Sequence, residues 1–524
     1  MEKEFSQLVD SLRGHSGLGQ LNHGLEKEAL RIDRHGYLSK KPHPDKLGSS
    51  LVHPLITTDF SEAQLELVTG VHNSIEGCMQ EMEEIHRFVY DVLDDELLWP
   101  SSMPCMLRGE KSIPLADFGT SNLGRFKRVY RQGLALRYGK YMQTISGLHY
   151  NFSIPNTLWA HHAKTCGEQD SVEFRNQSYL ALIRNVRRYT WLLVYLFGTS
   201  PAVCGSFLAG RTHSLEPFDG ESYYLPYATS LRMGRLGYQS AEQGRHYLSY
   251  NTLADYIASM VPLLTEPHPE YLDLGMQSAS GEYQQLSVSL LQIEAESYTP
   301  IRPKPKARGL RRPLVALKHQ GIEYLEVRCL DLNPFFPTGI DRTTLYFLDA
   351  FLLFAWLAPS PKDTKQSWDE SQSNQTKVVE QGRDPNLEVI VDGKPCSVPE
   401  LGSYVIDLVS QVADVVDEVV HGSEYRNAVS AQKEKLQDAS LTPSARLLQQ
   451  MATWDKSYYR TIETLSKQHR TDLLEQKLSN SKRQHYVELG VQSHIEQREL
   501  EASENDSFER YLDDYMQLDL SQSP

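Results

Sequence analysis

Four segments of the chain alternate apolar and polar residues, which is the periodicity of a β-strand with two different faces. They are HGLEKEALRI at 23–32, TTDFSEAQLELVTG at 57–70, QTISGLHYNFSIP at 143–155 and GIEYLEVRCLDLNPF at 321–335. In the third of these, Leu148, Tyr150 and Phe152 share one face. We therefore predict four strands that each bury one face and turn a polar face the other way.

The polar faces are rich in acids. Glu26 and Glu28 are two residues apart, and Glu326 is two residues before Arg328. The other candidates on these segments are Asp59, Glu66 and His149. Antiparallel sheets often keep one face in water, so a solvated face explains any single segment. If the faces converge instead, five carboxylates share one cavity and cannot all stay ionised there without cations.

Divalent cations would make such a convergence favourable. Mg²⁺ prefers oxygen ligands and commonly joins carboxylates to substrate phosphates, and one imidazole among the oxygens is also compatible with Mn²⁺. Arg328 would then be a charged donor for a transferring phosphoryl group. The pattern thus favours phosphate chemistry on a carboxylate-bound metal, provided that the four segments meet.

Composition narrows the class of protein. The 524 residues include 53 Lys and Arg against 68 Asp and Glu, a net charge of −15. This charge argues against bulk attraction to nucleic acid or to an anionic membrane, although a local basic site remains compatible with it. The six cysteines include no C-x-x-C pair, and we interpret them as free thiols of a reduced protein.

No targeting or membrane segment is visible. The first residues, MEKEFSQLVDSLRG, lack the basic stretch and apolar run of a signal peptide. The apolar runs YTWLLVYLFG and LYFLDAFLLFAWLA fall short of the roughly 20 residues that a membrane span needs, and the second contains Asp349. We expect two buried helices, at 177–198 and 341–358, in a cytoplasmic protein.

Further elements follow from periodicity and capping signals. Apolar residues at helical spacing predict helices over 76–99 and 401–420, and Thr442 with Pro443 predicts a helix start. The polar stretch 359–385 predicts a linker or surface loop. Because the candidate site residues extend from 26 to 328, a single site would place them in one domain. We expect one domain over 1–524, with a core at 10–358, a loop at 359–400, a helical part at 401–515 and an acidic tail at 516–524.

No single short motif in the sequence identifies the function. GTSNLGRF has the glycine spacing of a phosphate-binding P-loop, but Arg125 and Phe126 stand where that motif needs Lys and Ser or Thr. We therefore reject it and predict a loop that enters a basic helix. The basic, proline-rich segment PIRPKPKARGLRRP at 300–313 predicts a surface loop, with an anion-facing loop as the alternative.

Eight blocks in order strongly resemble the proteobacterial type of glutamate–cysteine ligase, also called γ-glutamylcysteine synthetase. They are GLEKEALRI, TTDFSEAQLELVT, WPSSMPC, GTSNLGRFKRVYRQGL, MQTISGLHYNFS, YYLPYATSLRMGRLGY, YTPIRPK and GIEYLEVRCLDLNPF. The resemblance covers about 10–358, weakens through 359–400 and continues faintly to about 515. It implies an α+β fold with a glutamine synthetase-like core, in which a curved antiparallel sheet forms a funnel-shaped active site with helices packed outside.

The resemblance also implies the reaction and its residues. ATP phosphorylates the γ-carboxylate of L-glutamate, and the amine of L-cysteine displaces phosphate, in the first step of glutathione synthesis. The residues matching the family's metal set are Glu26, Glu28, Asp59, Glu66, His149 and Glu326. Arg328 matches the arginine at the transferred phosphoryl group, and Arg232 matches the residue that holds the glutamate α-carboxylate. The matches to the cysteine pocket are Phe60, Tyr130, Gln143, Tyr238 and Tyr298.

Two alternatives stay open at this point. A related γ-glutamyl ligase would keep the metal set and use another amine, and an apolar pocket that accepts cysteine would also accept 2-aminobutyrate. A non-catalytic sensor of glutamate, nucleotide or glutathione would bind ligand without releasing ADP. We further expect Mg²⁺ as the metal, with Mn²⁺ as the alternative, glutathione as a feedback inhibitor, no nucleic-acid or membrane partner, and a monomer.

Overall fold

A seven-stranded antiparallel sheet lies at the centre of the computed structural model, which describes residues 2–218, 220–237, 242–306, 312–454 and 457–520. The strand order is β2–β3–β1–β5–β10–β9, and β4 pairs with the end of β1. The strands are β1 (Asn22–Ile32), β2 (Ile56–Thr58), β3 (Gln64–Val68), β4 (Leu97–Leu98), β5 (Leu148–Ser153), β9 (Ile301–Lys304) and β10 (Tyr324–Leu330). The combination of helices with an open antiparallel sheet confirms the predicted α+β class.

All four alternating segments form strands of this sheet, as predicted. Their apolar side chains are buried in one large core, including Leu25 of β1, Leu65 of β3, Tyr150 of β5 and Val327 of β10. This burial fixes the register, because a slip by one residue would turn every polar side chain into the core. The acidic residues lie on the opposite, polar faces of these strands.

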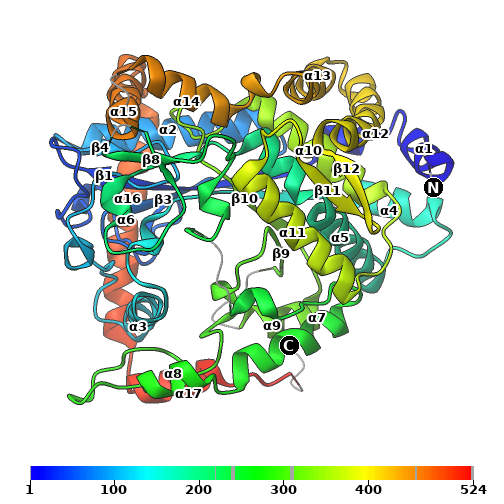
Figure 1. Cartoon of the computed structure of the whole chain (residues 1–524). Helices are drawn as coiled ribbons and strands as arrows, with labels where there is room; N and C mark the ends of the chain where they lie inside the picture. The colour runs from blue at the N-terminus through cyan, green and yellow to red at the C-terminus, as the bar shows by residue number, and fades with distance from the viewer. Residues whose placement is uncertain (1, 219, 238–241, 307–311, 455–456, 521–524) are drawn as a thin grey trace.

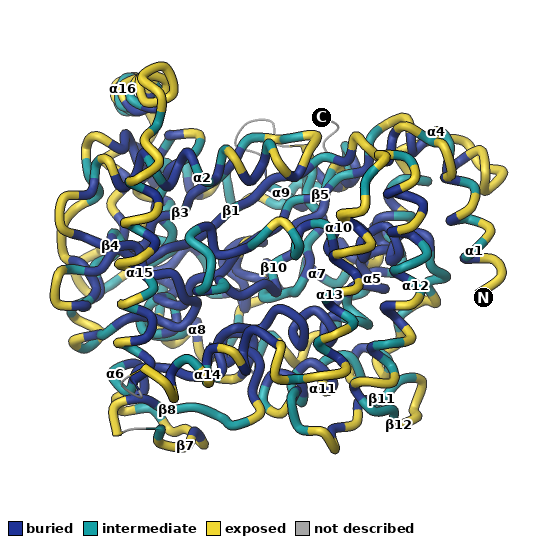
Figure 2. The backbone as a smooth tube through the Cα atoms, turned by 90° about the horizontal axis from the view of Figure 1, so that it is seen from above, coloured by how far each residue is buried: buried dark blue, intermediate teal, exposed yellow. Residues whose placement is uncertain are grey.

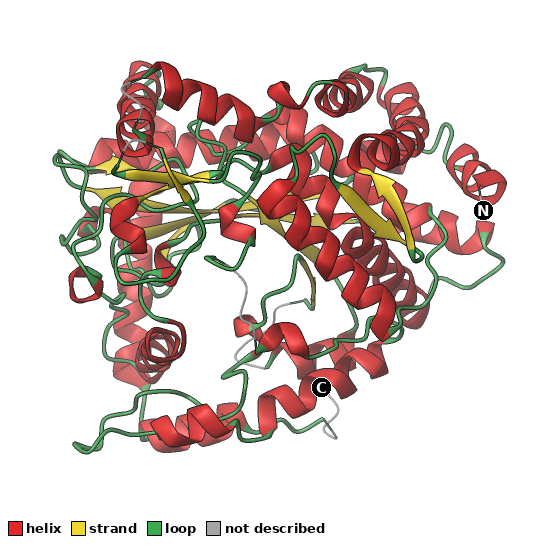
Figure 3. Cartoon of the chain, in the orientation of Figure 1, coloured by secondary structure: helices red, strands yellow, loops and turns green. Residues whose placement is uncertain are grey.

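Long helices pack outside the sheet (Figures 1 and 3). Five of the helices that contribute side chains to the large core are α2 (Ile75–Val92), α5 (Val172–Phe197), α10 (Arg342–Leu357), α12 (Val398–Val420) and α13 (Glu424–Gln437). Helix α10 is buried along nearly its whole length and contacts the other four. The predicted helices at 177–198, 341–358 and 401–420 are therefore confirmed, whereas the helix predicted over 76–99 ends at Val92, before β4.

The remaining elements surround this centre. The helices are α1 (Glu2–Ser11), α3 (Asn122–Tyr138), α4 (Asn156–Thr165), α6 (Gly205–Leu208), α7 (Leu253–Thr265), α8 (Pro269–Leu274), α9 (Pro313–Gln320), α14 (Pro443–Thr453), α15 (Tyr458–Glu475), α16 (Asn480–Ser503) and α17 (Phe508–Met516). Two small sheets are formed by β6 (Ala202–Cys204), β7 (Glu216–Pro217) and β8 (Ser222–Tyr224), and by β11 (Glu388–Val391) and β12 (Lys394–Ser397). Thr442 caps α14 with Pro443 in its first turn, as predicted. Figure 2 shows α16 at the rim, largely exposed.

The loop predicted over 359–400 is wrong for most of its length. Residues 365–381 form helix α11 (Lys365–Gln381), and β11 with β12 forms a hairpin. Thr364 and Ser367 make a capping box at the start of α11. The helix packs on α5 through few apolar side chains, Trp368, Val378 and Val379 among them. The many polar residues between these contacts dilute the helical period, so the sequence pattern misses the helix.

The basic segment 300–313 also departs from the predicted surface loop. Residues Ile301–Lys304 are the edge strand β9, which pairs with β10, and residues 307–311 lie outside the described part of the chain. Pro303 is tolerated in this strand because an edge strand leaves one side of its backbone unpaired. Within the described residues, no helix combines the length and the apolarity needed to cross a bilayer.

Candidate active site

The sheet register brings the predicted acids together. In the antiparallel pair of β1 and β3, Glu28 lies opposite Glu66, and in the pair of β1 and β5, Glu26 lies opposite His149. Glu326 of β10 lies opposite Asn151, two residues beyond His149 on the same face of β5. Directly opposed residues have their Cβ atoms about 5 Å apart, so these polar side chains share one surface.

Three of these side chains form a compact cluster, which we call the metal floor. His149 Nδ1 lies 3.3 Å from Glu26 Oε2 and 3.7 Å from Glu326 Oε1. One ligand atom from each of the three residues lies within 4.8 Å of the others, and in the described part of the chain no other group of His, Cys, Asp and Glu meets this criterion. Asn151 orients Glu26 by donating its amide to Oε1 at 2.7 Å.

Glu28, Asp59 and Glu66 make a second acidic group beside the floor. Glu28 accepts the backbone N–H of Gly147 at 2.7 Å, and its other oxygen lies 3.9 Å from His149 Nε2. Burial, together with the negative charge of Asp59 and Glu66, raises the pKa of Glu28 well above its usual range. Burial and Asp59 likewise raise the pKa of Glu66 to about 8. For Glu28 and Glu66, burial and the neighbouring carboxylates outweigh the nearby cations Arg232, Arg131 and Lys127.

Glu326 has the opposite electrostatic environment. Burial favours its neutral form, but three cations outweigh this effect and hold its pKa well below the usual value. They are Arg328 at 3.1 Å, Lys304 at 3.4 Å and Arg302 at 3.8 Å. Arg302 and Lys304 come from the edge strand β9, which sequence reasoning had assigned to a loop. The alternating basic residues of the block YTPIRPK were the available signal.

These residues fit divalent cations. His149 Nε2 is buried and makes no hydrogen bond within the described residues, although buried nitrogens of this kind normally have a partner. The neighbouring carboxylates are hard oxygen donors, and the raised pKa values of Glu28 and Glu66 report negative charge that a cation would neutralise. All six residues predicted as metal ligands thus lie on one face of the sheet or at its edge.

Arg232 lies deeper than a surface substrate contact would. It sits in a short 3₁₀ turn (Leu231–Met233), is 1% exposed and donates Nη2 to the backbone oxygen of Arg328 at 2.9 Å. A Cβ atom on Gly147 would come within 2.2 Å of Arg232 Nη2, so the glycine permits this close approach. Arg232 therefore lies close to the strands that carry Glu28 and Arg328.

The predicted cysteine-pocket residues gather at one side of these acids. Phe60 is buried, and Tyr130 and Tyr298 pack against the same apolar cluster. Burial raises the pKa of Tyr298, while a hydrogen bond with Gln143 opposes that rise. Tyr238 lies outside the described residues. Arg131, on the predicted basic helix that is now α3, donates to the backbone oxygen of Asp59.

A cavity of about 580 Å³ adjoins the site. Arg232, Tyr298 and Arg328 form its inner end, and Trp368, Gln372 and Gln375 of α11 lie on its wall. The helix that the sequence pattern missed therefore contributes to the surroundings of the active site.

Comparison with known proteins places this arrangement in context. The glutamate–cysteine ligase family model matches residues 7–378. The glutamate–cysteine ligase of Pseudomonas putida KT2440 is 45% identical over 500 residues, covering 95% of each chain. That of Saccharophagus degradans is 43% identical, covering 94% of this chain and 93% of its own.

Solved structures agree with these sequences. A crystal structure of the glutamate–cysteine ligase of Francisella tularensis in complex with AMP superposes with a TM-score of 0.89 at 34% identity, covering 95% of this chain and 97% of that chain. The bifunctional glutathione synthetase of Pasteurella multocida has the same fold, with a TM-score of 0.69 at 24% identity over 91% of this chain and 54% of that one.

Proposed function

This chain belongs to the glutamate–cysteine ligase family and forms γ-glutamylcysteine for glutathione synthesis in an ATP-dependent reaction, and we propose how its residues divide that reaction. Its core is of the glutamine synthetase type. The observation that carries the proposal is the metal floor of Glu26, His149 and Glu326 with Arg328 at its edge. Acids and a charged donor at one point suit phosphoryl transfer between two anions.

We assign Glu26, Glu28, Asp59, Glu66, His149 and Glu326 to the binding of Mg²⁺, with Mn²⁺ as an acceptable substitute. Bound there, the metal would neutralise the triphosphate and polarise its terminal phosphoryl group. The chain itself supplies the orientation of these ligands. Asn151 fixes Glu26, and the Gly147 N–H fixes Glu28, so both carboxylates are held before any substrate arrives.

The chemistry proceeds in two displacements. A γ-carboxylate oxygen of glutamate attacks the γ-phosphorus of ATP, the bond to the ADP oxygen breaks, and γ-glutamyl phosphate forms. The amine nitrogen of cysteine then attacks the γ-carbonyl carbon, and the carbon–oxygen bond to phosphate breaks as the nitrogen loses a proton to a nearby carboxylate. Arg328, whose guanidinium lies 3.1 Å from Glu326, would donate to the phosphoryl oxygens in both steps.

We assign the two amino-acid substrates to opposite sides of Arg328. Arg232 would attract the glutamate α-carboxylate, because it lines the cavity together with Arg328. Phe60, Tyr130, Gln143, Tyr238 and Tyr298 would enclose the cysteine side chain. An apolar pocket of this kind gains little from a thiol over a methyl group, so 2-aminobutyrate should replace cysteine within roughly 1–3 kcal/mol.

The same assignment bears on the inhibition, location and oligomeric state of the enzyme. We propose that glutathione inhibits the enzyme by placing its γ-glutamyl-cysteinyl part on the substrate sites. We further propose a cytoplasmic monomer in which residues 1–524 act as one catalytic domain.

Arg328→Lys tests the phosphoryl role. We expect kcat to fall by about 10³-fold, as for other arginines that stabilise this transfer, with the KM for glutamate nearly unchanged. Positional isotope exchange in ATP, with glutamate present and cysteine absent, should report γ-glutamyl phosphate in the wild type and fall in parallel in the variant. A normal exchange rate in Arg328→Lys would remove Arg328 from the transfer step.

A further inference from the structure

One buried carboxyl group beside the proposed cysteine pocket has no role in the reaction described above. Glu296 ends a short 3₁₀ turn two residues before Tyr298, and its side chain is fully buried. Burial and the negative charge of Glu296 raise the pKa of Tyr130, and the same charge adds to the effect of burial on the pKa of Tyr298. Glu296 therefore lies close to both described tyrosines assigned to the pocket.

Both oxygens of this carboxylate bind donors of the chain. Oε1 of Glu296 accepts the Tyr138 hydroxyl at 2.8 Å and Arg137 Nη1 at 3.2 Å. Oε2 accepts the Gln292 backbone N–H at 2.6 Å. Hydrogen bonds with a charged partner are among the stronger ones in proteins. Glu296 thus ties the end of α3, which carries Arg137 and Tyr138, to the turn before Tyr298.

Gln243 connects this carboxylate to Tyr298. Its side-chain amide donates to the Tyr138 hydroxyl at 3.1 Å and to the backbone oxygen of Glu296 at 3.2 Å. Its side-chain oxygen accepts the backbone N–H of Tyr298 at 3.0 Å. The rings of Tyr138 and Tyr298 meet edge to face, with their centroids 5.9 Å apart. The residues that bind Glu296 therefore hold Tyr298 by both its backbone and its ring.

The residue before Tyr298 is linked to the metal floor. Arg302 donates Nη2 to the backbone oxygen of Ser297 at 2.6 Å, and its Nη1 lies 3.8 Å from Glu326 Oε2. Tyr298 is thus held between the Glu296 contacts on one side and an arginine that reaches the metal floor on the other. A shift of the turn would move Tyr298 relative to the reacting groups.

Glu296 lies behind the surface of the cavity. Among the described residues, the cavity lining includes Gln243, Ser297 and Tyr298 but not Glu296. A carboxylate that binds three donors of the chain and does not reach the cavity is poorly placed to accept a proton from the substrate amine. Any effect of Glu296 on the reaction must therefore pass through the residues that it holds.

We propose that Glu296, Tyr138 and Gln243 are positioning residues that hold Tyr298 in the pocket for the acceptor amine. They determine how well cysteine binds, and they take no part in phosphoryl transfer. The inference rests on the proposed function, since it needs Tyr298 at the cysteine pocket. Binding groups work best when neighbouring hydrogen bonds and packing fix their orientation before the ligand arrives, and these three residues supply both kinds of contact.

The test compares the full-length wild type with Tyr138→Phe, Gln243→Leu and Glu296→Gln. Initial rates give kcat and the KM for cysteine, glutamate and ATP, and positional isotope exchange without cysteine reports the formation of γ-glutamyl phosphate. We expect the KM for cysteine to rise about tenfold in each variant, the equivalent of one lost hydrogen bond. The KM for glutamate and the isotope exchange rate should stay within about twofold of the wild type, because cysteine is not involved in that step.

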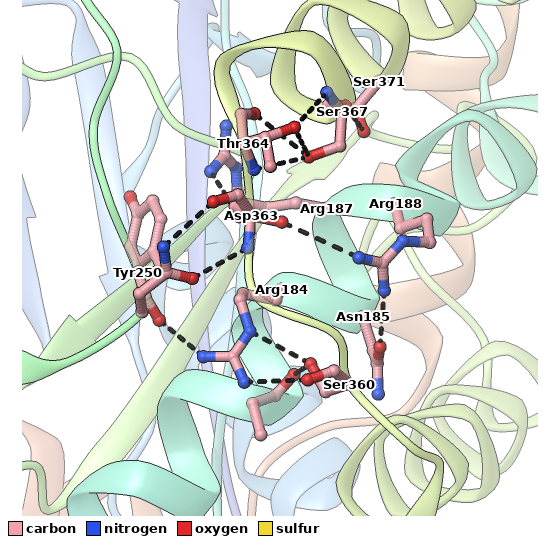
Figure 4. Close-up of polar contacts among 12 residues, drawn as sticks. Arg184, Asn185, Arg187, Arg188, Tyr250, Ser360, Asp363, Thr364, Ser367 and Ser371 are labelled. Carbon is pink, nitrogen blue, oxygen red and sulfur yellow. Dashed lines mark hydrogen bonds and ion pairs between the residues drawn. The ribbon is translucent and has the colours of Figure 1, made fainter. Parts of the chain in front are cut away.

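Ser360→Ala is the matched control, because this hydroxyl both donates and accepts as that of Tyr138 does. It donates to the Ala181 backbone oxygen at 2.9 Å and accepts Arg184 Nε at 3.1 Å. Figure 4 shows Ser360 and Arg184 in contact, and neither is among the described residues that line the cavity. The KM for cysteine of Ser360→Ala should equal that of the wild type.

Two results would overturn the proposal. One is an unchanged KM for cysteine in both Tyr138→Phe and Gln243→Leu. The other is a KM for glutamate or an isotope exchange rate that changes as much as the KM for cysteine, because the three residues would then support the whole site. Circular dichroism checks folding, and Tyr138→Phe decides if Glu296→Gln does not fold, since it keeps the ring. A wild type that forms no γ-glutamylcysteine would reject the proposed function itself, which is a separate failure.

Discussion

At the scale of single residues, the site separates two kinds of carboxyl group on one sheet face. Glu326 is surrounded by Arg302, Lys304 and Arg328 and stays ionised. Glu28 and Glu66 have mainly negative neighbours, and their pKa values are raised. The metal-free protein therefore holds protons where the proposed cations bind, and metal binding must displace them.

Because Mg²⁺ must displace these protons, its apparent affinity should depend on pH. The pKa of Glu66 is about 8, so below that pH its carboxyl group is protonated in the metal-free protein. Because Mg²⁺ binds the ionised form, its apparent affinity should weaken by up to about tenfold per pH unit for each displaced proton as the pH falls below 8. Calorimetric titration with Mg²⁺ in buffers of different ionisation enthalpy measures both the apparent affinity and the number of protons released. Proton release at pH 7 should shrink in Glu66→Gln, and an affinity independent of pH from 6.5 to 8.5 would contradict the assignment.

Gly147→Ala tests the contact between Arg232 and the acidic strands. The new methyl group would come within 2.2 Å of Arg232 Nη2, and the same residue donates its N–H to Glu28. We expect kcat/KM for glutamate to fall about 10- to 100-fold, since small displacements of binding groups have effects of this size. Steady-state kinetics checks this, with circular dichroism to show that the fold persists. Activity within twofold of the wild type would mean that Arg232 can move without consequence.

At the scale of elements, strand β1 organises the molecule. Glu26 and Glu28 face the site, while Lys27 between them points to the rear, where its ammonium group contacts His86 Nε2 at 2.7 Å and the Pro337 backbone oxygen at 2.6 Å. Burial lowers the pKa of Lys27 to about 7. Alternation along one strand thus supplies both the metal face and a polar anchor behind it.

Helix α10 lies at the centre of the helical layer, where it packs on α2, α5, α12 and α13, and Phe351 tests its contribution to the core. This side chain is fully buried, with Phe347 and Phe354 within about 6 Å. Phe351→Ala should lower the free energy of unfolding by about 3–5 kcal/mol, because it leaves a cavity in a packed core. Urea unfolding followed by fluorescence measures this change. Val172→Ala, at an exposed position of α5, is the control and should stay within about 0.5 kcal/mol; an equal effect of both substitutions would contradict the role of α10.

Some of these elements can be predicted from the sequence pattern, whereas others cannot. The strands are predictable because Leu148, Tyr150 and Phe152 bury one face at a period of two. Helix α11 is not, because its buried face also carries Asn374 and Gln375, and polar residues there hide the apolar period. The opposition of Glu28 to Glu66 depends on strand pairing, which involves residues far apart in the sequence. The place of α11 beside the cavity likewise depends on its packing against α5, which joins residues far apart in the sequence.

At the scale of the whole molecule, the chain has a net charge of −15, but the lining of the cavity beside the site includes five arginines. The overall charge favours solubility, whereas the local positive field favours the approach of small anions to the site. Among the described residues, the exposed large apolar side chains are distributed over loops and several helices, with Val71 before α2, Val491 in α16, and Leu272 and Leu274 together in α8.

These features predict a monomer. The exposed apolar residues of the described chain are distributed over several elements, and two copies with a net charge of −15 repel each other. Both features disfavour a stable interface between copies. Sedimentation velocity at micromolar concentration should give one species near the chain mass of 59.7 kDa, unchanged by dilution. A concentration-dependent species of twice this mass would contradict the prediction.

We propose that the metal floor supports phosphoryl transfer from ATP to glutamate, which cysteine then completes as a full turnover. ADP release with L-glutamate and MgATP, with and without L-cysteine, tests it in the wild type and in Glu326→Gln, which keeps the shape of the side chain and removes its charge. We expect ADP release that depends on cysteine in the wild type and is lost in Glu326→Gln. Equal release by both proteins would contradict the assignment of Glu326 and, with it, the proposed metal floor.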